Sequence, residues 1–453
     1  MTSKGPLHGL RVLERGQLIA IPSAMKMLAD MGAQVIRMES IHRLESYRNA
    51  SLYENNSEGA FWNRGANFYE QNRNKLGLTL DLSKPEGLSI LKELIKVSDI
   101  FAENFTPRVM KSFGIEYEDL VKIKPDLIMV SSTGYGFDGP WANFGATGPA
   151  TESASGMAIM TGYHNDMPIM PEIPYIAYTA AEHTVFAIMS ALIHRMSTGE
   201  GQFIDISQTE TASATVPEAL LDFIVNGRVE PRHGNDDPVM APHGCFRCKG
   251  QDKWITIAVQ NDHEWKTLCE ILNIEEAQAK SKDYSSTLDR WTNRNELHKL
   301  IDNHTKDWDN HKLTHLLQNN GVAAGSVMES PDLLFDKHLQ DRGFYEVVEH
   351  HPSTGMPPLP YASRPWKFSE TPAVTPKAAP IMGENNEFIL KELLGKTDEE
   401  FDALVATQII GSKPTQGTAV RAPDPNEQLR QGRMQRYDSD FKQKISEFYG
   451  TDK

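Results

Sequence analysis

The N-terminal region contains the pattern that most constrains the fold. Apolar residues over 10–14 and 34–38 predict two strands, and residues 22–31 between them predict a helix that begins at Pro22. Proline suits the first turn of a helix because its missing N–H would have no partner there anyway. Gly32 follows the helix, where glycine commonly ends one. Short links from strand to helix to strand favour neighbouring parallel strands, so we expect an α/β fold.

The same alternation continues along the chain. Further strands are predicted over 76–82, 99–105, 127–131 and 203–206, and a helix runs from Pro85 to about Val97. Apolar residues recur at helical spacing from Ala181 to Met196, and this helix should end at Gly199. The strands therefore predict one extended sheet with helices between its strands.

The length of the chain predicts more than one domain, because 453 residues exceed one compact core. We expect a large domain over residues 1–226, a small α+β domain over 227–325 and a return to the large domain over 326–411. Residues 412–453 are rich in proline, glycine and polar residues and are interpreted as a linker or an arm, with helical spacing over 437–449.

Composition excludes several classes of protein. Lys and Arg total 46 against 61 Asp and Glu, and this net charge of −15 argues against a nucleic-acid partner. Three cysteines indicate a reducing compartment without a disulfide framework. No run of 18 apolar residues predicts a membrane span, and the N-terminus lacks the apolar core of a signal peptide. A cytoplasmic location is the expectation.

Two motifs are interpreted as misleading. Residues 134–139 fit GxGxxG, but a dinucleotide site needs a helix to begin on that loop, and Pro140 is followed by no helical pattern. Cys245 and Cys248 form a CxxC pair near His243, but zinc would need further ligands within reach. We expect buried thiols there and no metal.

Several separate segments share a further property. The sequences NRNK at 72–75, ENFTP at 103–107, TGEGQFIDIS at 198–207 and APHGCFRCKGQDKWITIAV at 241–259 resemble, in this order, motifs of the family III CoA-transferases. That group includes formyl-CoA transferases and carnitine CoA-transferases. The resemblance covers roughly residues 6–410.

The resemblance implies a fold and a ligand. The fold is a large Rossmann-like domain formed by both chain ends with a small inserted α+β domain, and two chains interlock as a dimer. The substrate is coenzyme A or an acyl-CoA, and the residues expected to contact it are Gln17, Arg37, Asn72, Arg73, Lys75, Asn104, Arg108 and Tyr135. Arg73 and Lys75 could present two cations to phosphates. Their alternative interpretation is a solvated surface pair.

One departure from the family pattern determines the functional interpretation. The resemblance implies an aspartate on the segment just before the central helix, a nucleophile that attacks the thioester, and Ala177 occupies that position. Glu172 and Glu182 are the nearest carboxylates, but Glu182 would face about 140° away on a helix. Ile21 and Ala181 also stand where the family has glycine. We therefore expect no catalytic residue in this chain.

The favoured hypothesis is a non-catalytic subunit of a heteromeric CoA-transferase whose paralogous partner carries the aspartate. This arrangement resembles the two-subunit succinyl-CoA:(R)-benzylsuccinate CoA-transferases of anaerobic toluene degradation. A stand-alone CoA-binding or regulatory protein is one alternative. An active CoA-transferase with another nucleophile or a substrate-assisted route is another, and an engineered Asp→Ala substitution is also left open.

Overall fold

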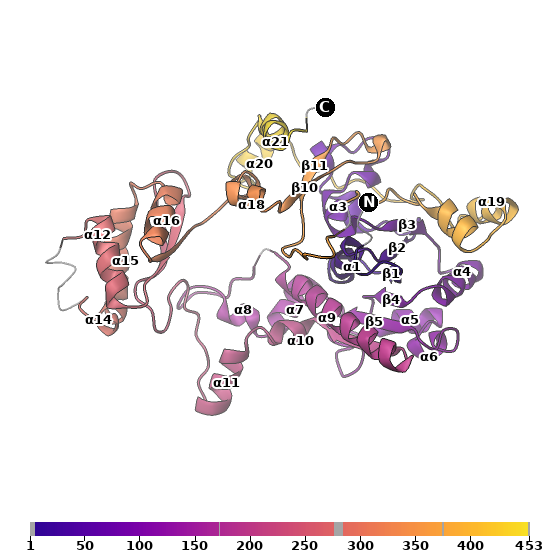
Figure 1. Cartoon of the computed structure of the whole chain (residues 1–453), viewed down its shortest axis with the longest axis horizontal. Helices are drawn as coiled ribbons and strands as arrows, with labels where there is room; N and C mark the ends of the chain where they lie inside the picture. Colours follow the sequence, from indigo (N-terminus) through magenta and orange to yellow (C-terminus); the bar gives the residue numbers. More distant parts are fainter. Residues whose placement is uncertain (1–4, 172, 276–283, 374–375, 452–453) are drawn as a thin grey trace. The chain divides into compact units, whose positions relative to one another are not determined.

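The computed structural model describes residues 5–171, 173–275, 284–373 and 376–451. The chain forms two compact units, each drawn from separate stretches of sequence (Figure 1). The first unit comprises Met1–Met157, Pro171–Pro217 and Lys337–Lys453, and the second comprises Ala158–Met170 and Glu218–Asp336.

The first unit is built on a six-stranded parallel sheet, as the strand and helix alternation predicts. Its order is β3-β2-β1-β4-β5-β6. The strands are β1 (Arg11–Arg15), β2 (Gln34–Glu39), β3 (Leu76–Thr79), β4 (Ile100–Glu103), β5 (Ile128–Thr133) and β6 (Gln202–Ser207). The direction in which strands are added reverses between β1 and β4, and parallel sheets bind ligands at the carboxyl end of such a switch point.

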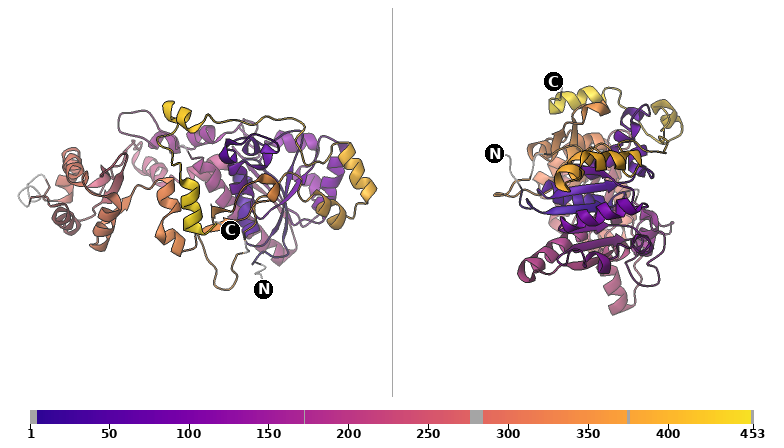
Figure 2. Two further views of the ribbon diagram at one scale, coloured as in Figure 1. Left: turned by 90° about the horizontal axis from the view of Figure 1, so that it is seen from above. Right: turned by 90° about the vertical axis from the view of Figure 1, so that its right-hand side faces the viewer.

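Helices cover both faces of this sheet, as Figures 1 and 2 show. Val12 and Leu13 are adjacent in β1 and belong to opposite hydrophobic cores, because successive side chains of a strand alternate between faces. One face packs against α1 (Ala20–Asp30) and α9 (Tyr175–Thr198). The other packs against α4 (Pro85–Lys96), α5 (Pro107–Phe113), α6 (Tyr117–Leu120), η4 (Phe388–Leu393) and α19 (Asp398–Ala406).

Helix α9 ends where its sequence predicts. Gly199 adopts the left-handed conformation with φ 77° and caps the helix, which costs glycine little because it has no Cβ. Arg195 in the last turn forms an ion pair with Asp99 at 3.0 Å. Among the described helices, α9 alone has the length and hydropathy of a membrane span. It packs against α1, β5 and β6, which is the environment of a core helix.

Shorter elements complete the first unit. They are α2 (Ser46–Asn49), η1 (Tyr53–Asn55), η2 (Phe61–Asn63), α3 (Ala66–Asn72), α7 (Gly148–Ala154), α10 (Gln208–Ser213), α18 (Lys337–Asp341), η3 (Pro352–Thr354), and the antiparallel hairpin of β10 (Tyr345–Val348) and β11 (Leu359–Ala362). The helix α8 (Met157–Met160) lies at the boundary with the second unit.

The C-terminal tail packs on its own chain. It contains α20 (Pro425–Arg430) and α21 (Phe441–Tyr449). Before these helices, Thr415 N donates to Ile41 O at 2.9 Å and Val420 N donates to Asn49 O at 2.7 Å. The tail therefore holds the loop that follows β2, a contact that its linker-like composition did not predict.

The second unit has its own core and an antiparallel sheet in the order β7-β8-β9. Its strands are β7 (His243–Arg247), β8 (Trp254–Ala258) and β9 (Ala323–Ser326), and its helices are α11 (Pro217–Asn226), α12 (Asp262–Leu272), α14 (Thr287–Thr292), α15 (Arg294–Thr305), α16 (Asn310–Asn319) and α17 (Ser330–Leu334). Residues 158–170 join it through backbone contacts such as Gly234 N to Gly162 O at 2.9 Å.

Candidate functional site

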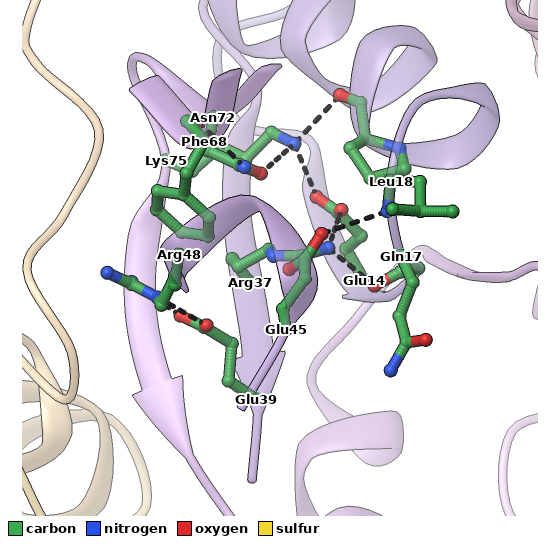
Figure 3. Close-up of polar contacts among 12 residues, drawn as sticks. Glu14, Gln17, Leu18, Arg37, Glu39, Glu45, Arg48, Phe68, Asn72 and Lys75 are labelled. Carbon is green, nitrogen blue, oxygen red and sulfur yellow. Dashed lines mark hydrogen bonds and ion pairs between the residues drawn. The ribbon is translucent and has the colours of Figure 1, made fainter. Parts of the chain in front are cut away.

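The switch point brings together two of the residues predicted to contact CoA. Gln17 follows β1 and Asn104 follows β4, and the two loops are joined by a pair of hydrogen bonds. Gln17 N donates to Asn104 Oδ1 at 2.8 Å, and Asn104 Nδ2 donates to Gln17 O at 2.9 Å. The side chain of Gln17 points away from the polar network drawn around it (Figure 3). Its amide is therefore free to meet a ligand beyond the strand ends.

The loop between β1 and α1 is held in an uncommon conformation. Leu18 has φ 59°, a region that bulky residues rarely adopt. Its N–H donates to Glu45 Oε1 at 2.9 Å. A strained residue that its surroundings hold in place is common at binding sites, and here the strain lies beside the Gln17–Asn104 pair.

The predicted cations Arg37 and Lys75 lie inside the molecule, joined through Glu14 (Figure 3). Arg37 Nη1 is 2.5 Å from Glu14 Oε1, and Arg37 Nη2 pairs with Glu45. Lys75 Nζ is 2.8 Å from Glu14 Oε2 and donates to Asn72 Oδ1 at 2.9 Å. The two buried cations, Arg37 and Lys75, are thus paired with the carboxylates of Glu14 and Glu45. Asn72 accepts a further hydrogen bond from Lys75.

Burial and pairing act in opposite directions on these groups. Burial alone would lower the pKa of Arg37, but the carboxylates of Glu45 and Glu14 outweigh it and raise that pKa. For Lys75 burial dominates and lowers the pKa to about 8, although Glu14 opposes the change. Lys75 is consequently the member of the network that gives up its proton most readily.

Arg73 is also satisfied within the chain. Its Nη2 is 2.6 Å from Asp30 Oδ2, and its Nη1 donates to the carbonyl of Ala362. Arg73 is 3% exposed and Lys75 is 5% exposed, so the alternative of a solvated surface pair is wrong. Their assignment as CoA contacts stays a prediction.

Three other arginines near the carboxyl edge of the sheet differ from this group. The side chains of Arg15, Arg43 and Arg108 form no hydrogen bond and no ion pair with any residue in the described part of the chain. Arg108 is exposed at the start of α5 and was predicted to contact CoA, whereas Arg15 and Arg43 were not predicted. The signal for Arg15 was present in the sequence, because it is a charged residue that ends an apolar strand.

Tyr135, the remaining predicted contact, lies in the loop after β5. Its ring makes edge-to-face contacts with Trp141 and Phe144, with ring centroids 5.7 and 6.1 Å apart. Both partners are about half exposed. No described helix begins between this loop and Gly148, and the fingerprint of a dinucleotide site requires one directly after the glycines.

The position expected for the nucleophile lies in the first turn of α9. Ala177 N donates to Pro174 O at 3.1 Å, and the neighbouring Tyr178 hydroxyl accepts from Gln71 Nε2 at 3.0 Å. A methyl group there cannot attack a thioester. Glu182 is exposed further along α9, and Glu172 lies outside the described residues.

The second departure from the family pattern also has a packing partner. A Cβ atom on Gly16 would lie 2.5 Å from Ile21 Cγ2, so the isoleucine fills the space above the end of β1. Ile21 and Ala181 are both fully buried in the core between the sheet, α1 and α9. Gly16 thus makes room for Ile21.

The sequence analysis missed Glu103, a buried carboxyl at the end of β4. It accepts hydrogen bonds from Phe105 N at 2.6 Å and from the Ser131 hydroxyl. Burial raises its pKa to about 7. Its motif ENFTP drew attention to the neighbouring asparagine, but a charged residue that ends a buried strand is itself a signal.

Three cavities among the described residues lie away from the predicted contacts. One of about 580 Å³ lies between α4 and α19, and two of about 440 and 470 Å³ lie in the second unit. None of the predicted contacts lines them. Within the described residues, no group of three His, Cys, Asp or Glu side chains lies close enough to hold a metal ion.

Comparison with known proteins decides the family. The family model described as CoA-transferase family III matches residues 7–386. The chain belongs to CoA-transferase family III.

Curated relatives of this family III chain match over nearly their whole length. A succinate--glutarate CoA-transferase of Agrobacterium fabrum is 31% identical over 86% of this chain and 96% of its own length. The beta and alpha subunits of a succinyl-CoA--L-malate CoA-transferase of Chloroflexus aurantiacus are 27% and 26% identical over 90% and 89% of this chain. These two matches cover 99% and 92% of the subunits themselves.

A solved structure has the same fold. The crystal structure of a CAIB/BAIF family protein from Brucella suis superposes with a TM-score of 0.78 at 28% identity, covering 86% of this chain and all of that chain.

Proposed function

We propose that this chain is the non-catalytic subunit of a heteromeric family III CoA-transferase. The observation that carries the proposal is Ala177 in the first turn of α9. A CoA-transferase of this type needs a carboxylate placed within about 3 Å of the thioester carbon. The exposed Glu182, five residues further along α9, does not share the direction of Ala177.

A paralogous chain would supply that carboxylate. The relatives from Chloroflexus aurantiacus support the possibility, because one CoA-transferase of this family carries the names of an alpha and a beta subunit, and both match this chain. We propose a heterodimer or a multiple of it. The acyl donor is succinyl-CoA, in keeping with the names of the relatives, and the acceptor is an aromatic dicarboxylate such as benzylsuccinate.

Exposed apolar side chains support an interlocked assembly. On α9, Phe186 is 76% exposed, Ile193 is 64% exposed and Met196 is 86% exposed. Helix α11 buries none of its residues, although it carries several large apolar side chains. Several large apolar side chains exposed on one helix are typical of an interface between chains, and each of the two helices carries such a set. The occupant we propose is the partner subunit.

In the proposed assembly the chain still binds a CoA thioester at its switch point. Gln17 presents a free amide there, and Arg108 is exposed beside Asn104. Arg37, Arg73 and Lys75 already have anionic partners in this chain. These three cations would position Asn72 and the loops that they contact. The phosphates of CoA would instead bind cations that have no anionic partner within the described residues.

The test is reconstitution. The chain should copurify from its native source with a similar-sized family III subunit that has aspartate at the position of Ala177. The pair should transfer CoA from succinyl-CoA to benzylsuccinate, and an Asp→Asn change in the partner should abolish transfer. Turnover by this chain alone, with no partner present, would contradict the proposal.

A further inference from the structure

Arg15 is half-buried, and its side chain has no polar partner among the described residues. It ends β1 at the switch point, and its guanidinium lies over the ring of Phe105 at 5.0 Å from the ring centre. No carboxylate or carbonyl of the described residues forms an ion pair or hydrogen bond with it. A buried or half-buried arginine normally has such partners, because its five N–H donors are costly to leave unsatisfied.

Charges of both signs surround Arg15, because Arg37 and Arg43 lower its pKa whereas Glu45 and Glu39 raise it. Burial lowers its pKa to about 10, and the charge of Arg37 adds to the effect while Glu45 opposes it. Arg43 is close enough to lower that pKa further, and Arg43 is itself exposed without an ionic partner in the part of the chain that the structure describes. An anion placed here would relieve this repulsion.

Sheet geometry relates Arg15 to a further unpaired cation. Side chains alternate along a strand, so Arg15 shares the sheet face of Leu13, against which α5 packs. Arg108 begins that helix, two residues after Thr106 and three after Phe105. Arg15 and the helix that carries Arg108 therefore lie on the same face of the sheet.

We propose that Arg15, assisted by Arg43 and Arg108, forms an oxyanion-binding site for a CoA thioester. A guanidinium is a planar fork whose N–H groups can bind two oxygens of one carboxylate or phosphate, and here it lies over an aromatic ring. The ring fixes the orientation and the missing intrachain partner leaves the fork open. This inference rests on the proposed function for the identity of its ligand.

Two parts of an acyl-CoA carry such an oxyanion. One is the free carboxylate at the far end of a dicarboxylic acyl group, and the other is a phosphate of the CoA moiety. The two sources are distinguished by comparing succinyl-CoA with butyryl-CoA, which has the same acyl chain length without the carboxylate. Arg15 would then determine acyl specificity in the first case and CoA affinity in the second.

The experiment is arginine footprinting of the full-length chain, in complex with its partner where the two are inseparable. Phenylglyoxal modifies the deprotonated guanidine, so the lowered pKa of Arg15 should make it more reactive than an ordinary arginine. Peptide mass mapping follows each arginine separately. Arg342, exposed and outside the site, is the control within the same sample.

Saturating succinyl-CoA should slow modification of Arg15 at least about 10-fold and leave Arg342 unchanged. Protection by succinyl-CoA but not by butyryl-CoA assigns the acyl carboxylate, and equal protection by both assigns a phosphate. The variant Arg15→Gln should weaken the protected ligand about 10- to 100-fold, as expected for a charged hydrogen-bond pair. Arg15→Lys should keep part of the affinity that Arg15→Gln loses. Arg342→Gln, the control, should leave the affinity unchanged.

Unchanged affinity in Arg15→Gln, with CoA thioesters still bound, would overturn this inference and leave the proposed function intact. If calorimetry shows that the wild-type chain binds no CoA thioester, the proposed CoA binding fails. Pyrophosphate and succinate are then the probes. Protection of Arg15 by either would support an oxyanion site for another ligand, and protection by neither would overturn it.

Discussion

Asn104 fixes Gln17 through both backbone polar groups, with its Oδ1 2.8 Å from Gln17 N and its Nδ2 2.9 Å from Gln17 O. The two residues are 87 positions apart in sequence and follow strands that are neighbours in the sheet. One amide side chain thus joins the two loops of the switch point, and an ionised carboxylate could not replace it because it has no donor.

Replacing Asn104 should loosen the loop that carries Gln17. The change Asn104→Ala removes both hydrogen bonds, and we expect a loss of about 1–3 kcal/mol in the free energy of unfolding. Amide hydrogen exchange over residues 16–20 should rise, because these N–H groups lose their fixed partners. Asn104→Asp keeps the acceptor and loses the donor, so it should give an intermediate result; no change in exchange for either variant would contradict the expected role.

Lys75 should matter more for stability than an exposed lysine. Lys75→Met leaves one carboxylate of the Glu14 and Glu45 pair without its cation, and breaking a buried ion pair in this way costs about 3–5 kcal/mol. Lys84→Met, at an exposed lysine, is the matched control and should change little. Denaturant unfolding measures both.

A second variant separates charge from volume at this position. Adding Glu14→Gln to Lys75→Met removes the uncompensated charge, and the double variant should recover part of the lost stability. If the double variant is less stable by the sum of both single changes, the two residues act independently and the network is not coupled.

Glu103 should make stability depend on pH. Its folded pKa of about 7 lies above the ordinary value of 4.5, so the folded state holds a proton that the unfolded state has lost between these values. Its stabilising contribution to the free energy of unfolding is therefore fully present below pH 4.5 and is lost as the pH rises to 7. The loss is on the order of 3 kcal/mol.

The variant Glu103→Gln tests this sign. It cannot ionise, so the variant should gain stability relative to the wild type at pH 8 and lose that advantage at pH 4.5. Glu349→Gln, at an exposed position, should run parallel to the wild type. Thermal unfolding at several pH values measures the difference, and a gap between wild type and Glu103→Gln that stays constant with pH would show that Glu103 does not titrate in this range.

The sequence predicted the parallel sheet because each strand carries its own local signal. Val12 and Leu13 belong to a continuous apolar run, which is typical of a parallel strand buried on both faces. In the structure the two side chains do lie in opposite cores. Gly199 predicted the end of α9 for a similarly local reason. The contact of the tail with Ile41 was not predictable, because it joins segments more than 370 residues apart through backbone groups that any sequence offers.

The site was predicted only in part, because a sequence shows which residues are charged but not which charges are already paired. Arg37 and Arg73 were expected to contact CoA, and the structure pairs them with Glu45 and Asp30. Arg15 was not predicted to bind a ligand, yet its guanidinium has no polar partner in the described part of the chain. The reason lies in the fold, because the segment between β4 and α5 places the ring of Phe105 beside it. Pairing is a property of the fold, and local patterns do not report it.

Restoring a carboxylate at Ala177 is the sharpest test of the proposed function. Ala177→Asp places a nucleophile in the first turn of α9, where the family resemblance expects one, and a carboxylate near a helix N-terminus is tolerated electrostatically. If the site remains otherwise intact, incubation with succinyl-CoA should give a covalent adduct on this chain, detectable as an increase in its mass. Ala177→Asn, of the same size without the nucleophile, is the control.

We expect no adduct, and the reason lies in packing. Ile21 fills the space above Gly16, and Ala181 is buried in the core one turn after Ala177, so side chains occupy both positions at which the family resemblance expects glycine. The complex should stay assembled and active through its partner, with turnover by the Ala177→Asp complex unchanged. Combining Ala177→Asp with Ile21→Gly should reopen the space and favour adduct formation. If the Ala177→Asp variant forms the adduct as fast as the partner subunit does, the missing carboxylate is the only defect of this site. The surrounding residues would then have kept a catalytic geometry.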